Sequence, residues 1–273
     1  MQAYSRWTPA TGTLGLIVAE AEIRADRLQP RSAALATAAA TAATPPSLRA
    51  VLRASSVTLL TEVKRQSPSK GSIARSLDAV AQARGYATGG AAALSILTEP
   101  VHFGGSIDDL RNVVREVELP VLKKDFHVRP VQLLEARAEG ASAALLIVRA
   151  LSPDRLKELM SVGNDIALEL LVEVRDEAEL DLALTLGATM VGVNNRNLET
   201  LVLDPGTAER IVPLIPASVV AIAESGISSR ADVDRYASVG ADAVLVGSSL
   251  SAATDPVAAT RALVGVPRRN RAR

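Results

Sequence analysis

The sequence predicts an α/β protein that folds as a (β/α)8 TIM barrel with an N-terminal helical extension. Its 273 residues are close in number to the roughly 250 that are typical of this barrel. Short apolar runs recur along the chain, and helical patterns separate most of them. The runs are continuous rather than alternating, as in strands that are buried on both faces. Strands that alternate with helices indicate a parallel sheet with right-handed crossovers.

The strands are marked by a repeat in which a glycine and a small connector precede a short apolar run. Copies of this pattern begin at Gly89, Gly140, Gly187 and Gly240, and glycine is the usual residue just after a helix. The eight predicted strands cover residues 57–63, 91–97, 119–124, 143–148, 167–173, 189–194, 219–224 and 243–247. An open doubly wound sheet is the structural alternative. No Gly-x-Gly-x-x-Gly follows the first strand, which disfavours a dinucleotide-binding version of that sheet.

Helices are predicted between the strands and before the first of them. The helices of the barrel are expected at residues 77–85, 107–117, 130–139, 152–162, 176–186 and 230–239. Within the extension, residues 14–28 have an amphipathic helical pattern, the Ala/Thr-rich residues 33–46 are interpreted as a helix or a linker, and residues 47–53 as a short helix. We therefore expect an N-terminal helical extension packed on the barrel over residues 1–55, the barrel over 56–265, and a disordered basic tail over 266–273.

The composition excludes several classes of protein. The chain has no cysteine, which excludes disulfides, thiolate nucleophiles and cysteine metal sites. With only His102 and His127, a multi-histidine metal centre is not expected. Thirty cations balance thirty anions, which does not favour nucleic-acid binding. There is no apolar run long enough to span a membrane and no secretory signal pattern, so we expect a soluble cytoplasmic protein.

Lysine is rare in this chain, because most of the cations are arginines. The lysines are Lys64, Lys70, Lys123, Lys124 and Lys157, and the first four lie in two short segments. Lysine supplies a compact ammonium with a tunable pKa, whereas arginine is a permanently charged planar fork. The two segments are therefore candidates for chemistry that needs an ammonium. For Lys70 and Lys123, we interpret the clustering as chance placement on solvated turns.

Charged residues recur at the carboxyl ends of the predicted strands, where barrels of this kind build their active sites. They are Glu62, Lys64, Lys124, Glu173, Arg196 and Glu224. A charge at the end of a buried strand is costly unless it is paired or functional. A structural ion pair would account for one of them, such as Glu62 or Glu224. The whole set, which spans five strands, predicts a polar active site.

Two segments after the last strands have the composition of an anion site. Glu224-Ser225-Gly226 follows the seventh strand, and Gly247-Ser248-Ser249 follows the eighth. Loops at these positions commonly bind phosphate, although Gly-Ser-Ser alone also fits a helix cap. Phe103 and Phe126 follow the second and third strands, where they suggest a flat apolar surface for an aromatic ligand or ordinary packing. We interpret the neighbouring histidines as loop residues without a catalytic role.

Taken together, these segments resemble the indole-3-glycerol-phosphate synthase family of tryptophan biosynthesis. The resemblance extends over residues 47–252 in the family's order. It is carried by residues 62–71, 97–100, 103–106, 122–126, 171–174, 193–198, 223–227 and 246–250. Single pieces such as Glu-Ser-Gly recur in other barrels, but the combination is specific.

The resemblance implies an activity and a role for each site residue. The family converts 1-(2-carboxyphenylamino)-1-deoxyribulose 5-phosphate to indole-3-glycerol phosphate, carbon dioxide and water. Lys124 would be the general acid of ring closure, and Glu173 and Lys64, supported by Glu62, would serve the dehydration. The division of acid work between the two lysines stays open. The implied substrate-binding residues are Ser67, Phe103, Phe126, Asn194, Arg196, Glu224 and Ser225, with Gly226, Gly247 and Ser248 on the phosphate.

The resemblance implies no metal and no organic cofactor, because rearomatisation drives the decarboxylation. The expected partner is a phosphorylated small molecule, and the expected state is a monomer or weak homo-oligomer. The Ala/Thr-rich residues 33–46 depart from the family's more charged helix, which leaves room for a diverged paralogue. An isomerase of the same pathway would be expected to use a cysteine, which this chain lacks. A non-catalytic barrel would be expected to have lost Lys64, Lys124 or Glu173, and all three are present.

Overall fold

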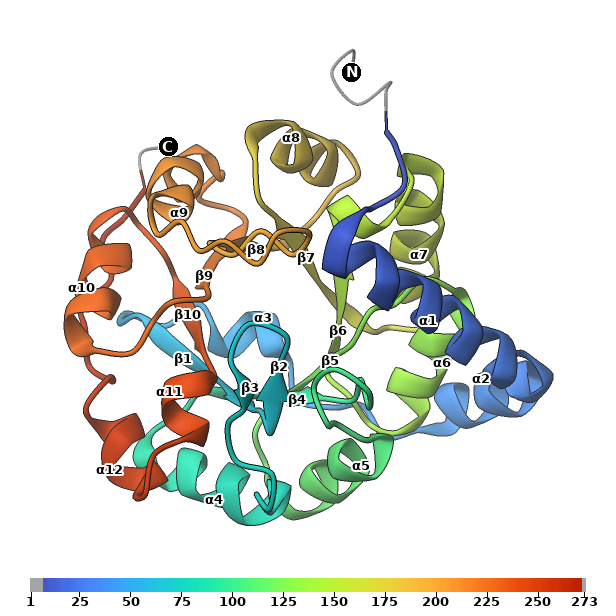
Figure 1. Cartoon of the computed structure of the whole chain (residues 1–273), viewed down its shortest axis with the longest axis horizontal. Coiled ribbons are helices and arrows are strands. Elements are labelled where there is room, and N and C mark those ends of the chain that lie inside the picture. Colours follow the sequence, from blue (N-terminus) through green and yellow to red (C-terminus); the bar gives the residue numbers. More distant parts are fainter. Residues whose placement is uncertain (1–6, 272–273) are drawn as a thin grey trace.

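Eight parallel strands form a closed barrel in the computed structural model, which describes residues 7–271 (Figure 1). Around the barrel the order is β1-β10-β9-β8-β7-β6-β5-β4. The strands are β1 (Thr58–Val63), β4 (Ala93–Leu97), β5 (Val121–Lys124), β6 (Ala143–Ile147), β7 (Glu169–Val174), β8 (Met190–Asn194), β9 (Val220–Glu224) and β10 (Ala243–Val246). The predicted fold class and all eight predicted strands are confirmed.

Helices surround the barrel as a second layer (Figure 1). They are α4 (Ala79–Gly89), α5 (Ile107–Glu116), α6 (Pro130–Ala138), α7 (Pro153–Asp165), α8 (Glu177–Thr185), α9 (Gly206–Ile211), α10 (Arg230–Ser238), α11 (Ser248–Ser251) and α12 (Pro256–Arg261). Polar residues start several of them: the side chains of Asp78, Ser106 and Ser229 accept backbone N–H groups of the first turn, which satisfies donors that a helix start leaves free. The six predicted helices are present, whereas α9, α11 and α12 are too short to have been recognised by periodicity.

The N-terminal extension consists of helices packed on one side of the barrel. Helix α1 (Gly12–Leu28) buries Leu14 and Ile17, and a 3-10 turn over Gln29–Arg31 leads into α2 (Ser32–Thr41), which lies along α6. Arg137 of α6 donates to the carbonyl oxygens of Ala42 and Ala43, both at 3.0 Å. Helix α3 (Leu48–Val51) follows. The segment 33–46 is thus largely helical and is anchored on the barrel.

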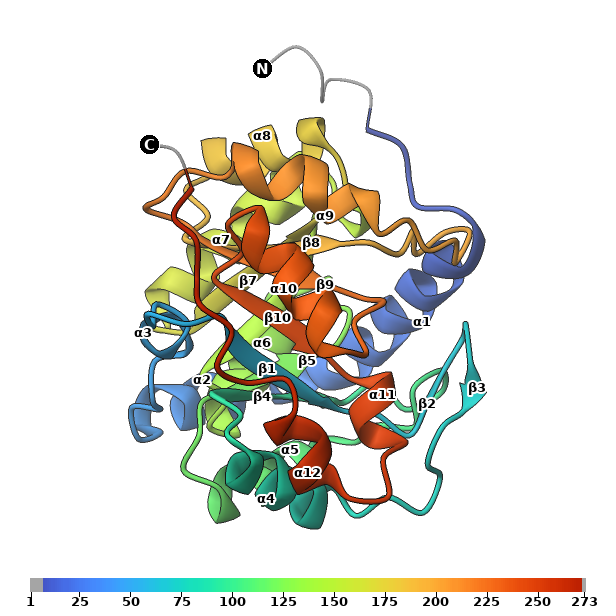
Figure 2. The same ribbon diagram turned by 90° about the vertical axis from the view of Figure 1, so that its left-hand side faces the viewer.

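A small hairpin that the sequence did not reveal stands over the carboxyl end of β1. It consists of β2 (Gln66–Ser67) and β3 (Gly71–Ser72), and it projects from the barrel beside α11 in Figure 2. Arg65 lies at the base of the hairpin. Its backbone carbonyl oxygen accepts the N–H groups of Ile73 and Ala74, and its guanidinium forms an ion pair with Asp109 of α5. The two-residue strands are too short to produce an alternating pattern.

The C-terminal segment corrects the expectation of a disordered tail from residue 266. Pro267 bridges to Ser56, and the side chains of Arg268 and Arg271 both pair with the buried carboxylate of Asp242, at 3.0 and 2.9 Å. A buried carboxylate needs such partners, so residues 266–271 are held on the barrel. Residues 272–273 of the predicted tail lie outside the described residues. In the described part of the chain, no helix is both long enough and apolar enough to cross a bilayer.

Candidate active site

The predicted site residues come together in one pocket at the carboxyl ends of the strands. Its lining includes Glu62, Lys64, Ser67, Phe103, Lys124, Phe126, Glu173, Asn194, Arg196, Glu224, Ser225, Gly226, Gly247 and Ser248. These residues come from seven of the eight strand ends and the loops after them. Thr13 and Ile17 of α1 also line the pocket, so the N-terminal extension forms part of its wall.

Lys124 lies at the centre of the charged groups. Its Nζ is 3.0 Å from Glu173 Oε2 and 3.2 Å from Glu224 Oε2. Burial alone would lower the pKa of Lys124, but the neighbouring carboxylates of Glu173, Glu224 and Glu62 outweigh burial and raise it. The side chain is therefore an ammonium at neutral pH and can donate a proton to an atom bound beside it.

Glu224 is a carboxyl group of the pocket whose pKa is strongly raised. Its side chain is buried, and burial raises its pKa to about 8 against the opposing effect of Lys124. Space for this side chain comes from Gly192 of β8, where a Cβ atom would lie 2.0 Å from Glu224 Oε1. Two carboxyl groups thus face one ammonium. The environment makes Glu224 a weaker acid than an ordinary glutamate.

A second charged pair lies at the end of β1. Lys64 Nζ forms an ion pair with Glu62 Oε1, and Ser95 of β4 donates to Glu62 Oε2 at 3.4 Å. The carboxylate fits closely against Gly247, where a Cβ atom would be 2.6 Å from Glu62 Oε1. Lys64 and Lys124 thus both line the pocket, and each is paired with at least one carboxyl group.

Glu173 is connected to the end of β8 through hydrogen bonds. Asn194 donates from Nδ2 to Glu173 Oε1 at 2.8 Å, and its own Oδ1 accepts the N–H of Arg196 at 2.9 Å. The Arg196 guanidinium donates to the carbonyl oxygen of Leu201 at 2.7 Å, and burial lowers its pKa. With both carboxylate oxygens engaged, Glu173 is fixed in orientation toward Lys124.

The aromatic side chains form an apolar wall of the pocket. The ring centroids of Phe103 and Phe126 are 6.1 Å apart with their planes tilted by 37°, within the range of favourable aromatic pairs. Other apolar residues of the lining are Ile17, Leu97, Leu145, Ile147, Leu198, Leu201, Leu203, Ile227 and Leu245. The pocket thus combines a flat apolar region with a cluster of charges.

The loops after β9 and β10 lie against each other on another side of the pocket. Ser225 and Gly226 have φ values of +69° and +80°, a conformation that turns the chain sharply at the end of β9. Ser249 donates its hydroxyl to the carbonyl oxygen of Ile227 at 3.2 Å, which joins the two loops. Ser248 is the first residue of α11, so its N–H has no partner within that helix.

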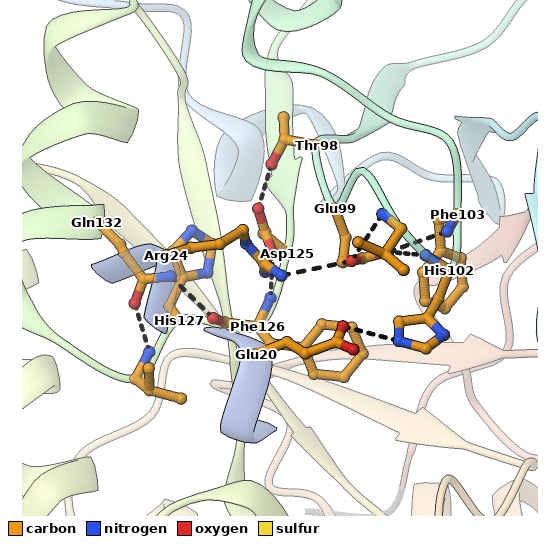
Figure 3. A network of polar contacts seen from close by, with 12 residues as sticks. Glu20, Arg24, Thr98, Glu99, His102, Phe103, Asp125, Phe126, His127 and Gln132 are labelled. Atoms are coloured by element: carbon orange, nitrogen blue, oxygen red, sulfur yellow. Dashed lines mark hydrogen bonds and ion pairs between the residues drawn. The ribbon is translucent and has the colours of Figure 1, made fainter. Parts of the chain in front are cut away.

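A polar network that the sequence analysis missed connects α1 to this site (Figure 3). Arg24 of α1 donates to Glu99 Oε1 at 3.3 Å and to Asp125 Oδ1 at 2.7 Å. Asp125 follows Lys124 directly and also accepts the hydroxyl of Thr98 at 2.7 Å and the N–H of Phe126 at 2.8 Å. One arginine of the extension thus contacts the loops after both β4 and β5.

Glu99 shapes the loop that carries Phe103. Its carboxylate accepts the N–H groups of Val101, His102 and Phe103 at 3.0, 2.7 and 2.9 Å. The imidazole Nε2 of His102 lies 2.9 Å from Glu20 Oε2 of α1 (Figure 3). The loop is thereby held by its own carboxylate and by the helix that lies over it.

Two residues near the site have environments that the sequence analysis did not anticipate. Lys123 is not on a solvated turn: its side chain is 2% exposed and pairs with Glu135 of α6. His127 is buried, with Nδ1 2.7 Å from the carbonyl oxygen of Leu145. Burial and the nearby Lys123 charge lower the pKa of His127 to about 4, which leaves it neutral at physiological pH. Neither residue lines the pocket.

Comparison with known proteins identifies the family. A family model described as indole-3-glycerol phosphate synthase matches residues 16–263. The chain belongs to the indole-3-glycerol phosphate synthase family. It is 50% identical to indole-3-glycerol phosphate synthase 1 of Streptomyces coelicolor, across 79% of this chain and 80% of that one. It is 47% identical to the synthase of Mycolicibacterium vanbaalenii, across 81% of each chain.

Solved structures with lower sequence identity share the fold. A 3-hexulose-6-phosphate synthase from Salmonella typhimurium superposes with a TM-score of 0.61 at 15% identity, over 76% of this chain and 96% of that one. A thiamine phosphate pyrophosphorylase from Pyrococcus furiosus gives a TM-score of 0.58 at 19% identity, over 80% and 96%. Family membership makes this chain a carboxy-lyase of tryptophan biosynthesis, which confirms the activity implied by the sequence.

Proposed function

We propose that the pocket closes the indole ring of 1-(2-carboxyphenylamino)-1-deoxyribulose 5-phosphate with Lys124 as the general acid. The observation that carries this proposal is the position of the Lys124 ammonium, which lies within 3.2 Å of the carboxyl groups of both Glu173 and Glu224. Such a group keeps its proton until a stronger base appears beside it. The alkoxide that develops during ring closure is such a base.

In the first step, the ring carbon that bears the carboxylate attacks the substrate ketone. A carbon–carbon bond forms, the carbonyl π electrons move to oxygen, and Lys124 donates a proton to that oxygen. Glu173 and Glu224 hold the ammonium in place before the transfer and stabilise its charge. Because the groups are already oriented by the barrel, little reorganisation accompanies the reaction.

In the second step, the ring carboxylate leaves as carbon dioxide. The electron pair of the broken bond returns to the ring and restores its aromaticity, so we propose that neither a metal nor an organic cofactor takes part. Phe103 and Phe126 would lie along the ring. An apolar surface disfavours the charge of a carboxylate. Loss of carbon dioxide removes that charge, so the surface favours this step.

In the third step, the new hydroxyl leaves as water, and the methylene carbon that joins its carbon to the nitrogen loses a proton. We assign the acid of this step to Lys64, which is paired with Glu62, and the base to Glu173, whose orientation Asn194 fixes. The electron pair of the broken carbon–hydrogen bond forms the carbon–carbon double bond of the new ring as the protonated hydroxyl leaves, and the nitrogen keeps its proton. This assignment divides the acid work between the two lysines.

The remaining residues would bind the rest of the substrate. The phosphate would lie against the loops after β9 and β10, at Gly226, Gly247 and Ser248, where Ser225 sets the turn. Arg196 and Ser67 would contact the carboxylate and the anthranilate end. We also propose a cytoplasmic enzyme that works as a monomer or weak homo-oligomer and does not bind nucleic acid, since its formal net charge is zero.

The direct test is conversion of the carboxyphenylamino substrate by the purified full-length chain, followed by the fluorescence of the indole product. We expect product to form at the same rate with and without EDTA. Absence of product under both conditions would contradict the activity, and loss of product only with EDTA would contradict metal independence. A non-catalytic barrel would bind a product analogue in this assay without turning substrate over.

A further inference from the structure

One buried hydroxyl spans the backbone on both sides of Val63, at the point where β1 ends. Ser251 Oγ donates to the carbonyl oxygen of Glu62 at 3.1 Å and accepts the N–H of Lys64, also at 3.1 Å. The side chain belongs to the last residue of α11 and is 4% exposed. It therefore contacts the backbone of both members of the Lys64–Glu62 ion pair without lining the pocket.

The ladder of the barrel explains why a hydroxyl is needed there. The N–H of Thr58 donates to the backbone carbonyl oxygen of Asp242, just before β10. Alternate residues of a strand direct their N–H and C=O groups to the same neighbouring strand. The carbonyl of Glu62 and the N–H of Lys64 face that side too. Pairing between β1 and β10 ends at Thr61 and Val246, because the chain then turns into α11. Ser251 supplies the hydrogen bonds that the missing strand would have made.

A second buried hydroxyl supports the first. The hydroxyl of Tyr86 from α4 lies 3.3 Å from the carbonyl oxygen of Glu62 and 3.2 Å from Ser251 Oγ. Burial raises the pKa of Tyr86 to about 12, so this hydroxyl keeps its proton and remains a donor. Tyr86 thus braces the same strand end from the helix layer.

The helix that carries Ser251 also begins at the proposed phosphate site. Helix α11 is a single turn from Ser248 to Ser251, and the N–H of Ser251 donates to the carbonyl oxygen of Gly247 at 2.8 Å. Gly247 itself packs against the Glu62 carboxylate. One short turn therefore contacts the phosphate region at its start and the backbone of Lys64 at its end.

We propose that Ser251 is a positioning residue that sets the place of Lys64 relative to the bound phosphate. The proposal rests on the proposed role of Lys64 as an acid. The phosphate fixes one end of the substrate at α11, and Ser251 fixes the backbone of Lys64 to the same turn. The distance between the anchored phosphate and the ammonium is thereby defined by one helical turn and two hydrogen bonds. Tyr86 contributes to the same positioning.

The test compares Ser251→Ala with Ser142→Ala. Ser142 is a matched control, because it is 3% exposed and its hydroxyl accepts the backbone N–H of Val121 at 3.1 Å, where β5 begins. We expect both variants to lower Tm, and only Ser251→Ala to lower kcat, by about tenfold, since small displacements of catalytic groups reduce rates strongly. A kcat within twofold of the parent value for Ser251→Ala, or an equal loss in Ser142→Ala, would overturn the proposal.

A double-mutant cycle with Lys64→Ala separates positioning from general weakening of the fold. If Ser251 acts through Lys64, Ser251→Ala lowers single-turnover rates about tenfold in the parent protein and less than about twofold in the Lys64→Ala background, because coupled residues are not additive. Equal losses in both backgrounds would refute the proposal. If Ser251→Ala does not fold, Tyr86→Phe is tested instead. An unchanged kcat in Tyr86→Phe would then contradict the positioning proposal. An inactive parent protein would contradict the proposed function itself.

Discussion

Gly192 of β8 provides the space that the carboxyl group of Glu224 occupies beside Lys124. A Cβ atom at Gly192 would lie 2.0 Å from Glu224 Oε1, well inside van der Waals contact. The two residues are on neighbouring strands, because Gly192 pairs with Ile222 and Asn194 with Glu224. The arrangement of charges in the pocket therefore depends on the absence of a side chain at one position of the barrel interior.

Gly192→Ala is predicted to displace Glu224 and to lower kcat. The added methyl would push the carboxyl group away from the ammonium of Lys124, and we expect a loss of about tenfold or more, since catalytic geometry is sensitive to shifts of this size. Steady-state kinetics measure it. Gly206→Ala, at the start of α9, is the control and should leave kcat unchanged. Full activity of Gly192→Ala would argue against a requirement for this placement of Glu224.

Glu224→Gln is predicted to change how stability depends on pH. The pKa of Glu224 is raised from 4.5 to about 8, so the folded state holds a proton there that the unfolded state loses at lower pH. This contribution to stability is complete below about pH 4.5 and is lost as the pH rises through about 8. The Tm of the parent protein relative to Glu224→Gln should therefore fall between pH 6 and pH 9. A constant difference would contradict the raised pKa.

Arg24→Ala is predicted to raise KM. Its guanidinium joins α1 to Glu99 and Asp125, which hold the loops that carry Phe103 and Phe126. Without it we expect the aromatic wall to be less well ordered and KM to increase by about tenfold. Arg27→Ala is the matched control, because Arg27 lies on the same helix and is exposed. Equal KM values for the two variants would show that the contacts of Arg24 do not affect substrate binding.

Arg271→Ala is predicted to lower stability and to leave catalysis unchanged. The side chain of Arg271 is 3% exposed and pairs with Asp242, and neither residue lines the pocket. Removing Arg271 leaves the buried carboxylate of Asp242 with Arg268, whose side chain is 27% exposed, so we expect a loss of about 1–3 kcal/mol, which is typical of a lost hydrogen bond to a charged group. Denaturant unfolding measures this loss. The exposed Arg269→Ala should have no effect, and a stable Arg271→Ala would restore the interpretation of the segment as a free tail.

The barrel and the site lining could be predicted from the sequence because both follow from local rules. Continuous apolar runs mark strands buried on both faces, and polar residues at their carboxyl ends must converge when the strands close into a ring. This is why Lys124, Glu173 and Glu224, which lie on three strands far apart in the chain, could be placed together in advance.

Other features depended on contacts that no local pattern encodes. Arg24 has the position of an ordinary surface arginine on an amphipathic helix, and its partners are 75 and 101 residues away. The prediction that Lys123 lies on a solvated turn was wrong. Successive side chains of a strand point to opposite faces, so Lys123 points away from the pocket that Lys124 lines. It lies between β5 and α6, where it pairs with Glu135. The period of two in the strand was the signal that could have placed it.

The turnover of Lys124→Ala tests the central claim most directly. In the fluorescence assay for indole product, with Lys157→Ala as the control for loss of an exposed lysine, we expect the kcat of Lys124→Ala to fall by at least about a hundredfold and that of Lys157→Ala to equal the parent value. A Lys124→Ala variant with near-normal turnover would contradict the assignment of this ammonium as the acid of ring closure.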